Sequence, residues 1–414
     1  MIIEVITTGD ELMSGLTRDG NFTWAGHSLF SLGFEIGYHT TVGDDRDRIE
    51  EALGIARKRA HTVIVTGGLG PTPDDLTAEV AARLIGAPLE LNDGTLRTME
   101  ERLGSRGRSL TETNKKQAYL PKGSKVLINH WGTAPGFSFE SERTVFYFLP
   151  GVPKEFYAMM GEYVIPELLR RDNERKPFRS KLVKTFGLPE SEVARMLEGA
   201  QREGVKLGYR SHFPEIHLRV SSYGETEQDA DALMSEFMSD IKSRLSEYIF
   251  STGGETLEEV VGKLLRESGK TLATAESCTG GLIAHRVTNV PGSSDYFLEG
   301  IVSYSNEAKE KVLGVPLDMI EAQGAVSAPV VEAMARGVRN LAGSDIGVAV
   351  SGIAGPGGGS AEKPVGTVFI GVDNGEQGSP FSEKFRFYGT REDIKLISSE
   401  KALQIIMKIL LNNV

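Results

Sequence analysis

The first part of the chain alternates short apolar segments with longer amphipathic ones, and this pattern constrains the fold more than any other feature. The apolar segments favour buried β-strands, and the amphipathic segments have the apolar periodicity of helices. Such alternation is typical of a parallel sheet that helices cover on both faces. Strands are expected at residues 2–7, 34–41 and 62–66, and helices at 21–32, 47–59 and 74–84.

Turn signals divide the rest of the chain. A strand at 145–149 ends at the Pro-Gly-Val-Pro segment 150–153, and a helix follows to about residue 169, which predicts a first domain at 1–171. After a charged junction at 170–176, a small α+β domain is expected at 172–252. Its strands are expected at 181–186, 206–209 and 216–221, and its helices from about 189 and at 226–248. A linker at 251–254 precedes an α/β domain at 253–414, with helices at 257–267, 280–288 and from 391, and strands at 271–275, 345–350, 365–372 and 381–387.

The composition is that of a globular protein with apolar cores, since 40% of the 414 residues are apolar and 25% are charged. The net charge of −11 argues against a surface built mainly for nucleic acid or for anionic membranes. No apolar run reaches the roughly 18 residues of a membrane span, and no basic segment leads into an apolar one at the N-terminus. The single cysteine, Cys278, rules out an internal disulfide and a cysteine cluster for zinc. A cytoplasmic protein is therefore expected.

Two glycine-rich loops follow expected strands in the C-terminal domain. The first is Thr-Ala-Glu-Ser-Cys-Thr-Gly-Gly at 274–281, and the second is Ser-Gly-Ile-Ala-Gly-Pro-Gly-Gly-Gly at 351–359. Small residues at the start of a helix let backbone amides approach a phosphate. Loops that follow two strands of one parallel sheet meet at its carboxyl edge, where such sheets bind ligands. The alternative for either loop is an ordinary tight turn.

Hydroxyl side chains and one lysine lie between these loops, in the segments 291–294 and 300–309. No histidine accompanies them, so a Ser-His-Asp triad fits poorly. A buried lysine with a lowered pKa can instead take the proton of a serine, and Tyr304 could relay a proton or bind the oxyanion. The residues alone leave alternatives open: Lys309 could be a surface lysine, and Cys278 or Ser277 could be the nucleophile.

Acidic residues stand beside glycines in two N-terminal loops, at 8–12 and 66–75. Glycine amides can hold phosphate oxygens, while carboxylates bind a hard divalent cation that bridges the phosphates. This combination suits metal-assisted hydrolysis of a phosphoanhydride. The alternative for Asp75 is that it caps the next helix.

The motifs AESCTGG, GSS, YSNEAK, GAVS, SGIAGPGGG and KPVGTV, in this order, resemble the C-terminal domain of the CinA family, the nicotinamide-nucleotide amidohydrolases. The resemblance covers nearly all of residues 255–414. It implies hydrolysis of nicotinamide mononucleotide to nicotinic acid mononucleotide and ammonia, without a cofactor. It assigns the nucleophile to Ser294 and the supporting roles to Tyr304 and Lys309. The substrate-binding residues it implies are Glu276, Ser277, Thr279, Gly280, Gly281, Asn306, Gly352 and Gly355.

The motifs TGDEL, GGLGPTPDD and LPGVPKE resemble the molybdopterin-binding fold, which predicts a three-layer α/β/α domain. In CinA proteins this domain is associated with a metal-dependent ADP-ribose pyrophosphatase. The resemblance implies substrate binding by Gly67, Gly68, Gly70 and Thr72, and binding of Mg, Mn or Co by Asp10, Glu11, Asp74 and Asp75. A pterin-binding protein is the alternative. The middle domain is similar to a KH-type domain, but it lacks a GXXG clamp, so RNA binding is not expected.

Three hypotheses remain from the sequence: a salvage enzyme with amidase and pyrophosphatase sites, a molybdopterin-handling protein, and a non-catalytic partner in DNA uptake. The net charge of −11 weakens the third, because phosphate contacts need basic surfaces. The second leaves the C-terminal motifs without a role. The first accounts for both sets of loops, and its partners would be nicotinamide mononucleotide, ADP-ribose and a second copy of the chain in a homodimer.

Overall fold

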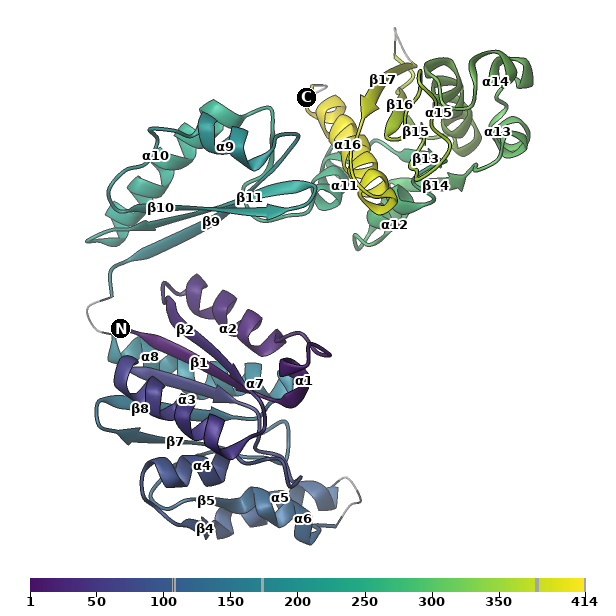
Figure 1. The fold of residues 1–414 in the computed structure, drawn as a ribbon. Helices are drawn as coiled ribbons and strands as arrows, with labels where there is room; N and C mark the ends of the chain where they lie inside the picture. Colours follow the sequence, from purple (N-terminus) through teal and green to yellow (C-terminus); the bar gives the residue numbers. More distant parts are fainter. Residues whose placement is uncertain (106, 108, 173–174, 377–379, 413–414) are drawn as a thin grey trace. The chain divides into compact units, whose positions relative to one another are not determined.

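The computed structural model describes residues 1–105, 107, 109–172, 175–376 and 380–412. The chain forms two compact units (Figure 1). One comprises Met1–Arg179 with Tyr223–Ala230, and the other comprises Ser180–Ser222 with Asp231–Val414. Of the junction expected at 170–176, Asn173 and Glu174 lie outside the described residues.

The first unit contains a six-stranded sheet in the order β2-β1-β3-β8-β7-β6. The four strands from β2 to β8 are parallel, and β7 and β6 are antiparallel additions at the edge. The strands are β1 Ile3–Thr8, β2 Ile36–Val42, β3 Thr62–Thr66, β6 Lys125–Leu127, β7 Gly136–Ser141 and β8 Thr144–Leu149. The strands β1, β3 and β8 are buried along their whole length; apolar residues predominate in β3 and β8, and the buried Glu4 of β1 is paired with Arg59.

Helices cover both faces of this sheet (Figure 1). One face packs on α2 Gly20–Ser31, α7 Pro153–Met159 and α8 Ile165–Arg171. The other packs on α3 Arg46–Arg59 and α4 Thr77–Leu84. The expected three-layer α/β/α fold is confirmed. The helix expected from Asp74 begins three residues later, because Asp75 turns back to hydrogen-bond Thr72. A short helix, α1 Asp10–Met13, follows β1. No elements were expected at 85–144. This segment contains β4 Leu89–Leu91, α5 Asp93–Ser105, α6 Glu112–Lys115 and β5 Tyr119–Pro121, besides β6 and β7.

The middle part of the chain forms a four-stranded sheet in the order β10-β11-β9-β12. Its strands are β9 Phe178–Phe186, β10 Val205–His212, β11 Glu215–Tyr223 and β12 Ile249–Ser251. The helices α9 Glu190–Met196 and α10 Glu227–Leu245 share one apolar core with this sheet. The small α+β fold matches the expectation, and its elements fall close to the expected ranges.

The C-terminal part forms a five-stranded sheet in the order β14-β13-β15-β16-β17. The first three strands are parallel and the last two are antiparallel. The strands are β13 Leu272–Glu276, β14 Phe297–Val302, β15 Ile346–Gly352, β16 Thr367–Asp373 and β17 Phe381–Arg386. The sequence analysis predicted all of these except β14, whose residues alternate between half-buried and exposed.

The helices of this domain pack on both faces of the sheet. One core contains α11 Leu257–Ser268, α12 Leu282–Thr288 and α16 Arg391–Asn412. The other contains α15 Ala328–Ala342, with α13 Asn306–Leu313 and α14 Leu317–Gln323 beside it. The α/β fold expected for this domain is confirmed. No helix among the described residues is long and apolar enough to cross a membrane.

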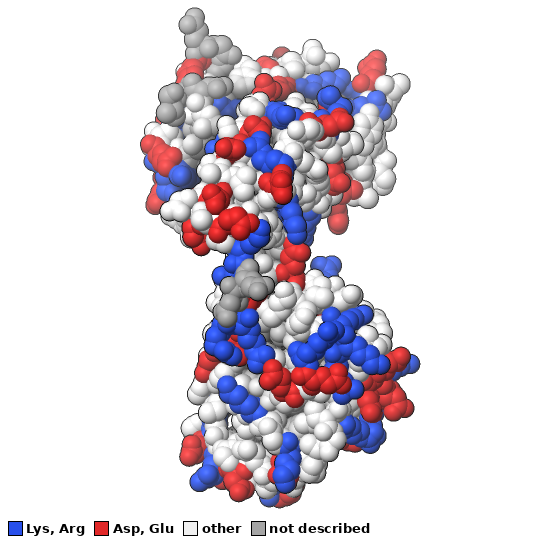
Figure 2. Space-filling model, turned by 90° about the vertical axis from the view of Figure 1, so that its left-hand side faces the viewer, with Lys and Arg blue, Asp and Glu red and all other residues white. Residues whose placement is uncertain are grey.

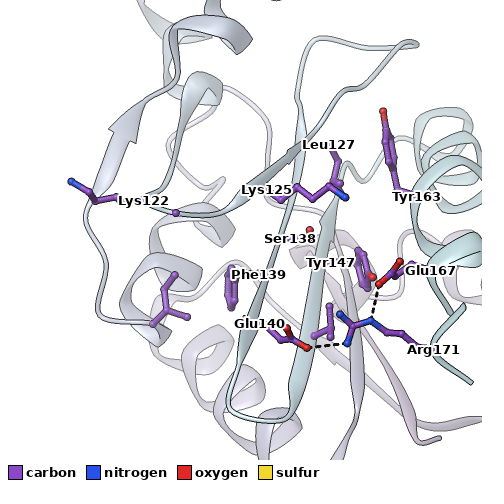
Figure 3. Close-up of a pocket in the computed structure, with 13 residues that line it drawn as sticks. Lys122, Lys125, Leu127, Ser138, Phe139, Glu140, Tyr147, Tyr163, Glu167 and Arg171 are labelled. Carbon is purple, nitrogen blue, oxygen red and sulfur yellow. Dashed lines mark hydrogen bonds and ion pairs between the residues drawn. The ribbon is translucent and has the colours of Figure 1, made fainter.

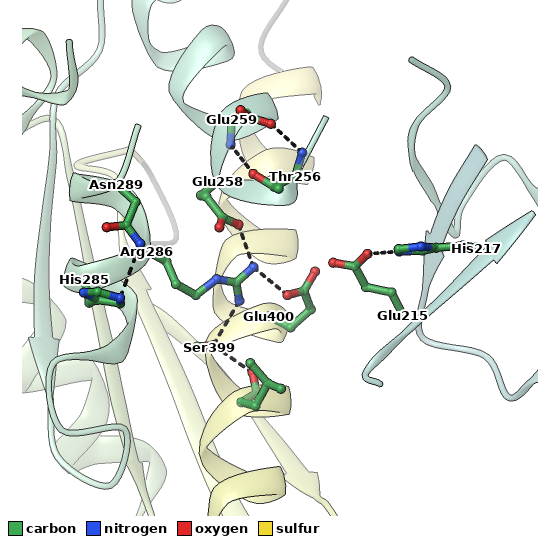
Figure 4. A network of polar contacts seen from close by, with 11 residues as sticks. Glu215, His217, Thr256, Glu258, Glu259, His285, Arg286, Asn289, Ser399 and Glu400 are labelled. Carbon is green, nitrogen blue, oxygen red and sulfur yellow. Dashed lines mark hydrogen bonds and ion pairs between the residues drawn. The ribbon is translucent and has the colours of Figure 1, made fainter. Parts of the chain in front are cut away.

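A buried ionic network links α11, α12 and α16 (Figure 4). The Arg286 guanidinium lies 2.7 Å from a carboxylate oxygen of Glu258 and 2.7 Å from one of Glu400, and it donates to the hydroxyl of Ser399. Glu400 is 1% exposed. Glu215 of β11, which binds His217, points toward Glu400 from the opposite side (Figure 4). Because burial penalises the carboxylate, and Glu215 repels it, the pKa of Glu400 is raised to about 7 despite the attraction of Arg286.

Candidate active site

Three loops meet at the carboxyl edge of the C-terminal sheet. They follow the adjacent strands β13, β14 and β15. The amide of Ser277 donates to the carbonyl of Val350 at 2.9 Å, and the amide of Ser303 donates to the carbonyl of Glu276 at 2.9 Å. These two bonds hold the loop after β13 against both neighbours. The loops that the sequence analysis singled out therefore do lie side by side.

Lys309 of α13 lies beneath these loops and is only 1% exposed. Its Nζ atom lies 3.2 Å from the Oγ atom of Ser277, 2.8 Å from the carbonyl oxygen of Ser303 and 3.3 Å from that of Tyr304. All three neighbours are uncharged, so no opposite charge offsets the cost of burying an ammonium group. Burial therefore lowers the pKa of Lys309, which favours the neutral amine.

Ser294 lies at the other edge of the sheet. It is exposed and belongs to a single 3-10 turn, Ser293–Asp295, that immediately precedes β14. Because β14 is parallel to β13, its start and its end lie at opposite edges. A strand of six residues is about 20 Å long at 3.3 Å per residue. Within one chain the structure does not bring Ser294 together with Lys309; the serine at Lys309 is Ser277.

The carboxylate of Glu276 occupies the start of α12. It accepts hydrogen bonds from the amides of Gly281 at 3.0 Å, Ile283 at 3.1 Å and Ala284 at 2.8 Å. The backbone amides at this helix start were expected to bind a phosphate, and Glu276 was expected to bind another part of the substrate. The geometry differs from that expectation, because three of the amides are already satisfied and a negative charge stands where the anion was expected.

Cys278 lies in the same loop but is 5% exposed. Burial is the main reason that the pKa of its thiol is raised to about 12, and Glu276 raises it further, while Arg391 and Lys309 lower it. The thiol therefore keeps its proton near neutral pH, which weakens the cysteine alternative. Gly352 packs against this side chain: a Cβ atom at Gly352 would lie 3.0 Å from the Sγ atom of Cys278.

The remaining expected residues surround this centre. Tyr304 is 63% exposed, and its hydroxyl accepts a hydrogen bond from Arg391 at 3.1 Å. Arg391 also donates to the carbonyl oxygen of Gly355 at 2.7 Å, and so connects the loops after β14 and β15. Asn306 is exposed in the first turn of α13, and Thr279 is fully buried. Gly280 and Gly281 have φ angles of 65° and 92°, which glycine adopts without strain.

Sequence reasoning missed Arg391, which connects the loops after β14 and β15, and Lys395, one turn further along α16, whose Nζ atom would lie 3.7 Å from a Cβ atom at Gly280. A cation in the first turn of a helix opposes the helix dipole, which favours acidic residues there. An arginine at the first position of an expected helix was therefore a usable signal.

A second candidate site lies at the carboxyl edge of the N-terminal sheet, in a cavity of about 470 Å³. The expected residues that line it are Glu11, Gly67, Gly68, Gly70, Asp74 and Asp75. Asp10 and Thr72 instead contact lining residues: the Asp10 carboxylate accepts the amide of Asp44 at 3.1 Å, and Thr72 donates to Asp75 from its amide at 2.8 Å and its hydroxyl at 2.5 Å. Asp44 was not foreseen, although it lies in the loop that follows β2.

The four carboxylates expected to bind a metal do not form a ready-made centre. Within the described part of the chain no three His, Cys, Asp or Glu side chains are arranged to hold a metal ion. Asp75 closes a turn with Thr72, as described above. The pKa of Asp44 is raised, first by burial and then by repulsion from Asp10, Glu11 and Asp74. We therefore derive no chemical step through a metal at this site.

Another cavity of the N-terminal domain, of about 410 Å³, lies over β6, β7 and β8 (Figure 3). Its only arginine, Arg171, lies 2.8 Å from Glu167 and 2.9 Å from Glu140, so its charge is neutralised. The same cavity is also lined by Lys122, which lies 2.7 Å from Glu90, and by Lys125. On the face shown in Figure 2, basic and acidic side chains are interspersed over each unit.

Known protein families and relatives match this chain over nearly its whole length. Family models match at residues 4–170 (Probable molybdopterin binding domain), 180–251 (Damage-inducible protein CinA KH domain) and 254–410 (CinA C-terminal domain). A CinA-like protein of Citrifermentans bemidjiense is 46% identical over 99% of this chain and 98% of its own length. A CinA-like protein of Geotalea uraniireducens is 42% identical over 100% and 98%.

Among solved structures, the protein CinA from Thermoplasma acidophilum is 32% identical and matches 40% of this chain and 96% of its own, with a TM-score of 0.38. The competence/damage inducible protein CihA from Agrobacterium tumefaciens is 40% identical and matches 37% of this chain and 92% of its own, with a TM-score of 0.35.

Proposed function

The chain belongs to the CinA family, and we propose that its C-terminal domain is a serine amidohydrolase that converts nicotinamide mononucleotide to nicotinic acid mononucleotide and ammonia. The contact of 3.2 Å between Lys309 Nζ and Ser277 Oγ is the observation that carries this proposal. The resemblance pointed to a serine paired with Lys309, and Ser277 is the serine within its reach.

The amine of Lys309 is suited to act as the base. In its neutral form its two N–H groups can donate to the carbonyl oxygens of Ser303 and Tyr304, which leaves the lone pair, 3.2 Å from Ser277 Oγ, to take the hydroxyl proton. Burial supports this form by lowering the pKa of the amine. A positioned base of this kind is what activates a serine nucleophile in the absence of histidine.

The reaction follows from this pair. Lys309 takes the proton of Ser277 as Oγ attacks the carboxamide carbon, and the resulting ammonium returns it to the departing nitrogen, which leaves as ammonia. Water then attacks the acyl-serine ester as Lys309 accepts one of its protons. The Lys309 ammonium passes that proton to Ser277 Oγ as the ester bond breaks, and the acid product leaves and ionises to its carboxylate. The Tyr304 hydroxyl accepts a hydrogen bond from Arg391 and lies at the far end of its side chain from Lys309, so these steps do not use it.

The test compares single variants of the full-length protein by ammonia release from nicotinamide mononucleotide. Ser277→Ala should lose several orders of magnitude in kcat, because binding groups do not replace a covalent nucleophile. Ser294→Ala and Cys278→Ala should keep most of the turnover. An active Ser277→Ala with an inactive Ser294→Ala would refute the pair and would return the nucleophile to the motif serine, supplied from a second protomer.

For the N-terminal domain we propose hydrolysis of ADP-ribose, supported by the cavity of about 470 Å³ that the glycine loops line. All charged side chains that line it are acidic, so a phosphate would need a cation brought with the substrate, such as Mg, Mn or Co. Release of AMP from ADP-ribose, assayed with and without these ions, tests the proposal. Binding of a pterin without AMP release under any ion would favour the alternative.

A further inference from the structure

The amides that were expected to bind the phosphate of the nucleotide already donate hydrogen bonds within the protein. The Glu276 carboxylate holds three amides at the start of α12, at 2.8–3.1 Å. A phosphate placed there would lose these donors and would face a buried carboxylate. The anion therefore needs other partners near the same loop.

Two cations of α16 are available for this role. Arg391 and Lys395 are four residues apart, so they lie on the same face of the helix. A Cβ atom at Gly280 would lie 3.7 Å from the Nζ atom of Lys395, so the loop after β13 leaves space beside that amine. The contacts of Arg391 are a hydroxyl and a carbonyl oxygen, and among the described residues neither cation has a carboxylate partner. Asp393, which lies between them in sequence, is bound to Thr390.

Tyr304 separates these cations from the amidase centre by a fixed length. Its carbonyl oxygen accepts from Lys309 at 3.3 Å, whereas its hydroxyl accepts from Arg391 at 3.1 Å. One tyrosine side chain thus lies between the amine that would activate the nucleophile and the guanidinium. A substrate whose amide and anionic ends are that far apart spans both, as a mononucleotide does.

We infer that Arg391 and Lys395, and not the start of α12, bind the phosphate monoester of the substrate and make the site specific for a nucleotide over its nucleoside. Two positive charges match the double charge of a phosphate monoester, and a guanidinium can bind phosphate through two parallel hydrogen bonds. The inference rests on the proposed amidase function, because Tyr304 measures its distance from the Ser277–Lys309 pair.

The experiment measures kcat/KM of the full-length protein for nicotinamide mononucleotide and for nicotinamide riboside, which lacks the phosphate. Arg391→Gln and Lys395→Gln should each lower kcat/KM for the nucleotide by roughly 10- to 100-fold, the range for a lost hydrogen bond to a charged group. Turnover of the riboside should change by less than about threefold. Arg391→Lys should recover part of the loss, and Lys408→Gln, an exposed lysine on the same helix, is the matched control.

A parallel loss on both substrates, or no loss on either, would overturn the inference. Calorimetric titration with ribose 5-phosphate separates it from the proposed function. Wild type that hydrolyses neither substrate refutes the amidase proposal, yet binding of ribose 5-phosphate that weakens in both glutamine variants would still support the phosphate site. Wild type that does not bind ribose 5-phosphate and shows no preference for the nucleotide would refute the site itself.

Discussion

Replacing Glu400 by glutamine should stabilise the second unit at alkaline pH and leave it nearly unchanged at acidic pH. Glu400 is fully enclosed, with Arg286 and Glu258 on one side and Glu215 on the other (Figure 4). Its pKa is raised from an ordinary 4.5 to about 7, first of all by burial. Each pKa unit corresponds to about 1.4 kcal/mol, so the native state loses about 3 kcal/mol when this group ionises within the fold.

The sign follows from proton binding. Between about pH 4.5 and pH 7 native Glu400 holds its proton while the unfolded chain has released it, so the free energy of unfolding falls as the pH rises through this window. Above pH 7 Glu400 is ionised in both the native and the unfolded state, and the full loss of about 3 kcal/mol in the free energy of unfolding persists. Glutamine cannot ionise, and its carbonyl oxygen can still accept from Arg286. Glu400→Gln should therefore match wild type near pH 5 and exceed it by up to about 3 kcal/mol at pH 8.

The assay uses the distribution of tryptophan. Both tryptophans, Trp24 and Trp131, lie in the first unit. Fluorescence thus follows urea unfolding of that unit alone, and the remaining far-UV circular dichroism change reports the second unit. Glu307→Gln, an exposed carboxylate of the same domain, is the control and should keep the wild-type pH dependence. Parallel pH curves for wild type and Glu400→Gln, or a variant less stable at pH 8, would refute the reasoning.

Four further outcomes are expected. The kcat/KM for deamidation should rise with pH, because Lys309 must lose its proton to act as a base. Since burial lowers the pKa of Lys309, the rise should have its midpoint below pH 10.5, the ordinary pKa of a lysine. A midpoint at or above pH 10.5 in the pH profile contradicts this role. Chelation of divalent ions should leave ammonia release intact while abolishing AMP release from ADP-ribose, and a metal-dependent deamidase would exclude the Ser-Lys chemistry. Asp75→Ala should cost the first unit about 1 kcal/mol in tryptophan-monitored unfolding, because two hydrogen bonds from Thr72 are lost; unchanged stability with lost pyrophosphatase would instead identify a metal ligand. Sedimentation should give a homodimer, and a mass near the 45.0 kDa of one chain at micromolar concentration would disprove it.

The strands that carry the loops were predictable because they are buried on both faces. Short segments in which apolar residues predominate, such as β3 and β8, leave few alternatives to a buried strand, and loops after parallel strands must meet at one edge. For this reason the association of the loops after β13 and β15, with Lys309 nearby, followed from sequence. Fold class followed in the same way.

The assignment of Ser294 as the nucleophile, which the resemblance implied, stays a prediction, but the separation of Ser294 from Lys309 within one protomer was not foreseen. The edge strand β14 was not recognised, because Glu299 and Gly300 interrupt its apolar residues, and its positions alternate between half-buried and exposed. Once β14 is placed, Ser294 precedes the strand and Tyr304 follows it, so the two must lie at opposite edges of the sheet. The sequence could not predict that Glu276 caps α12, because a glutamate at the end of a strand can equally well bind a ligand.

The bonds from Glu276 to α12 also determine when the loop becomes ordered. A loop whose amides have no hydrogen-bond acceptor in the free protein becomes ordered only when a substrate anion binds. Part of the binding free energy is then offset by the loss of conformational entropy of the loop. Here the protein carries its own anion, so that entropy is already lost when the chain folds. The amides of Gly281, Ile283 and Ala284 should therefore exchange slowly with deuterium in the free protein, and adding nucleotide should hardly change their rates. Substrate would then enter a rigid site, and its association would not be slowed by rearrangement of the loop.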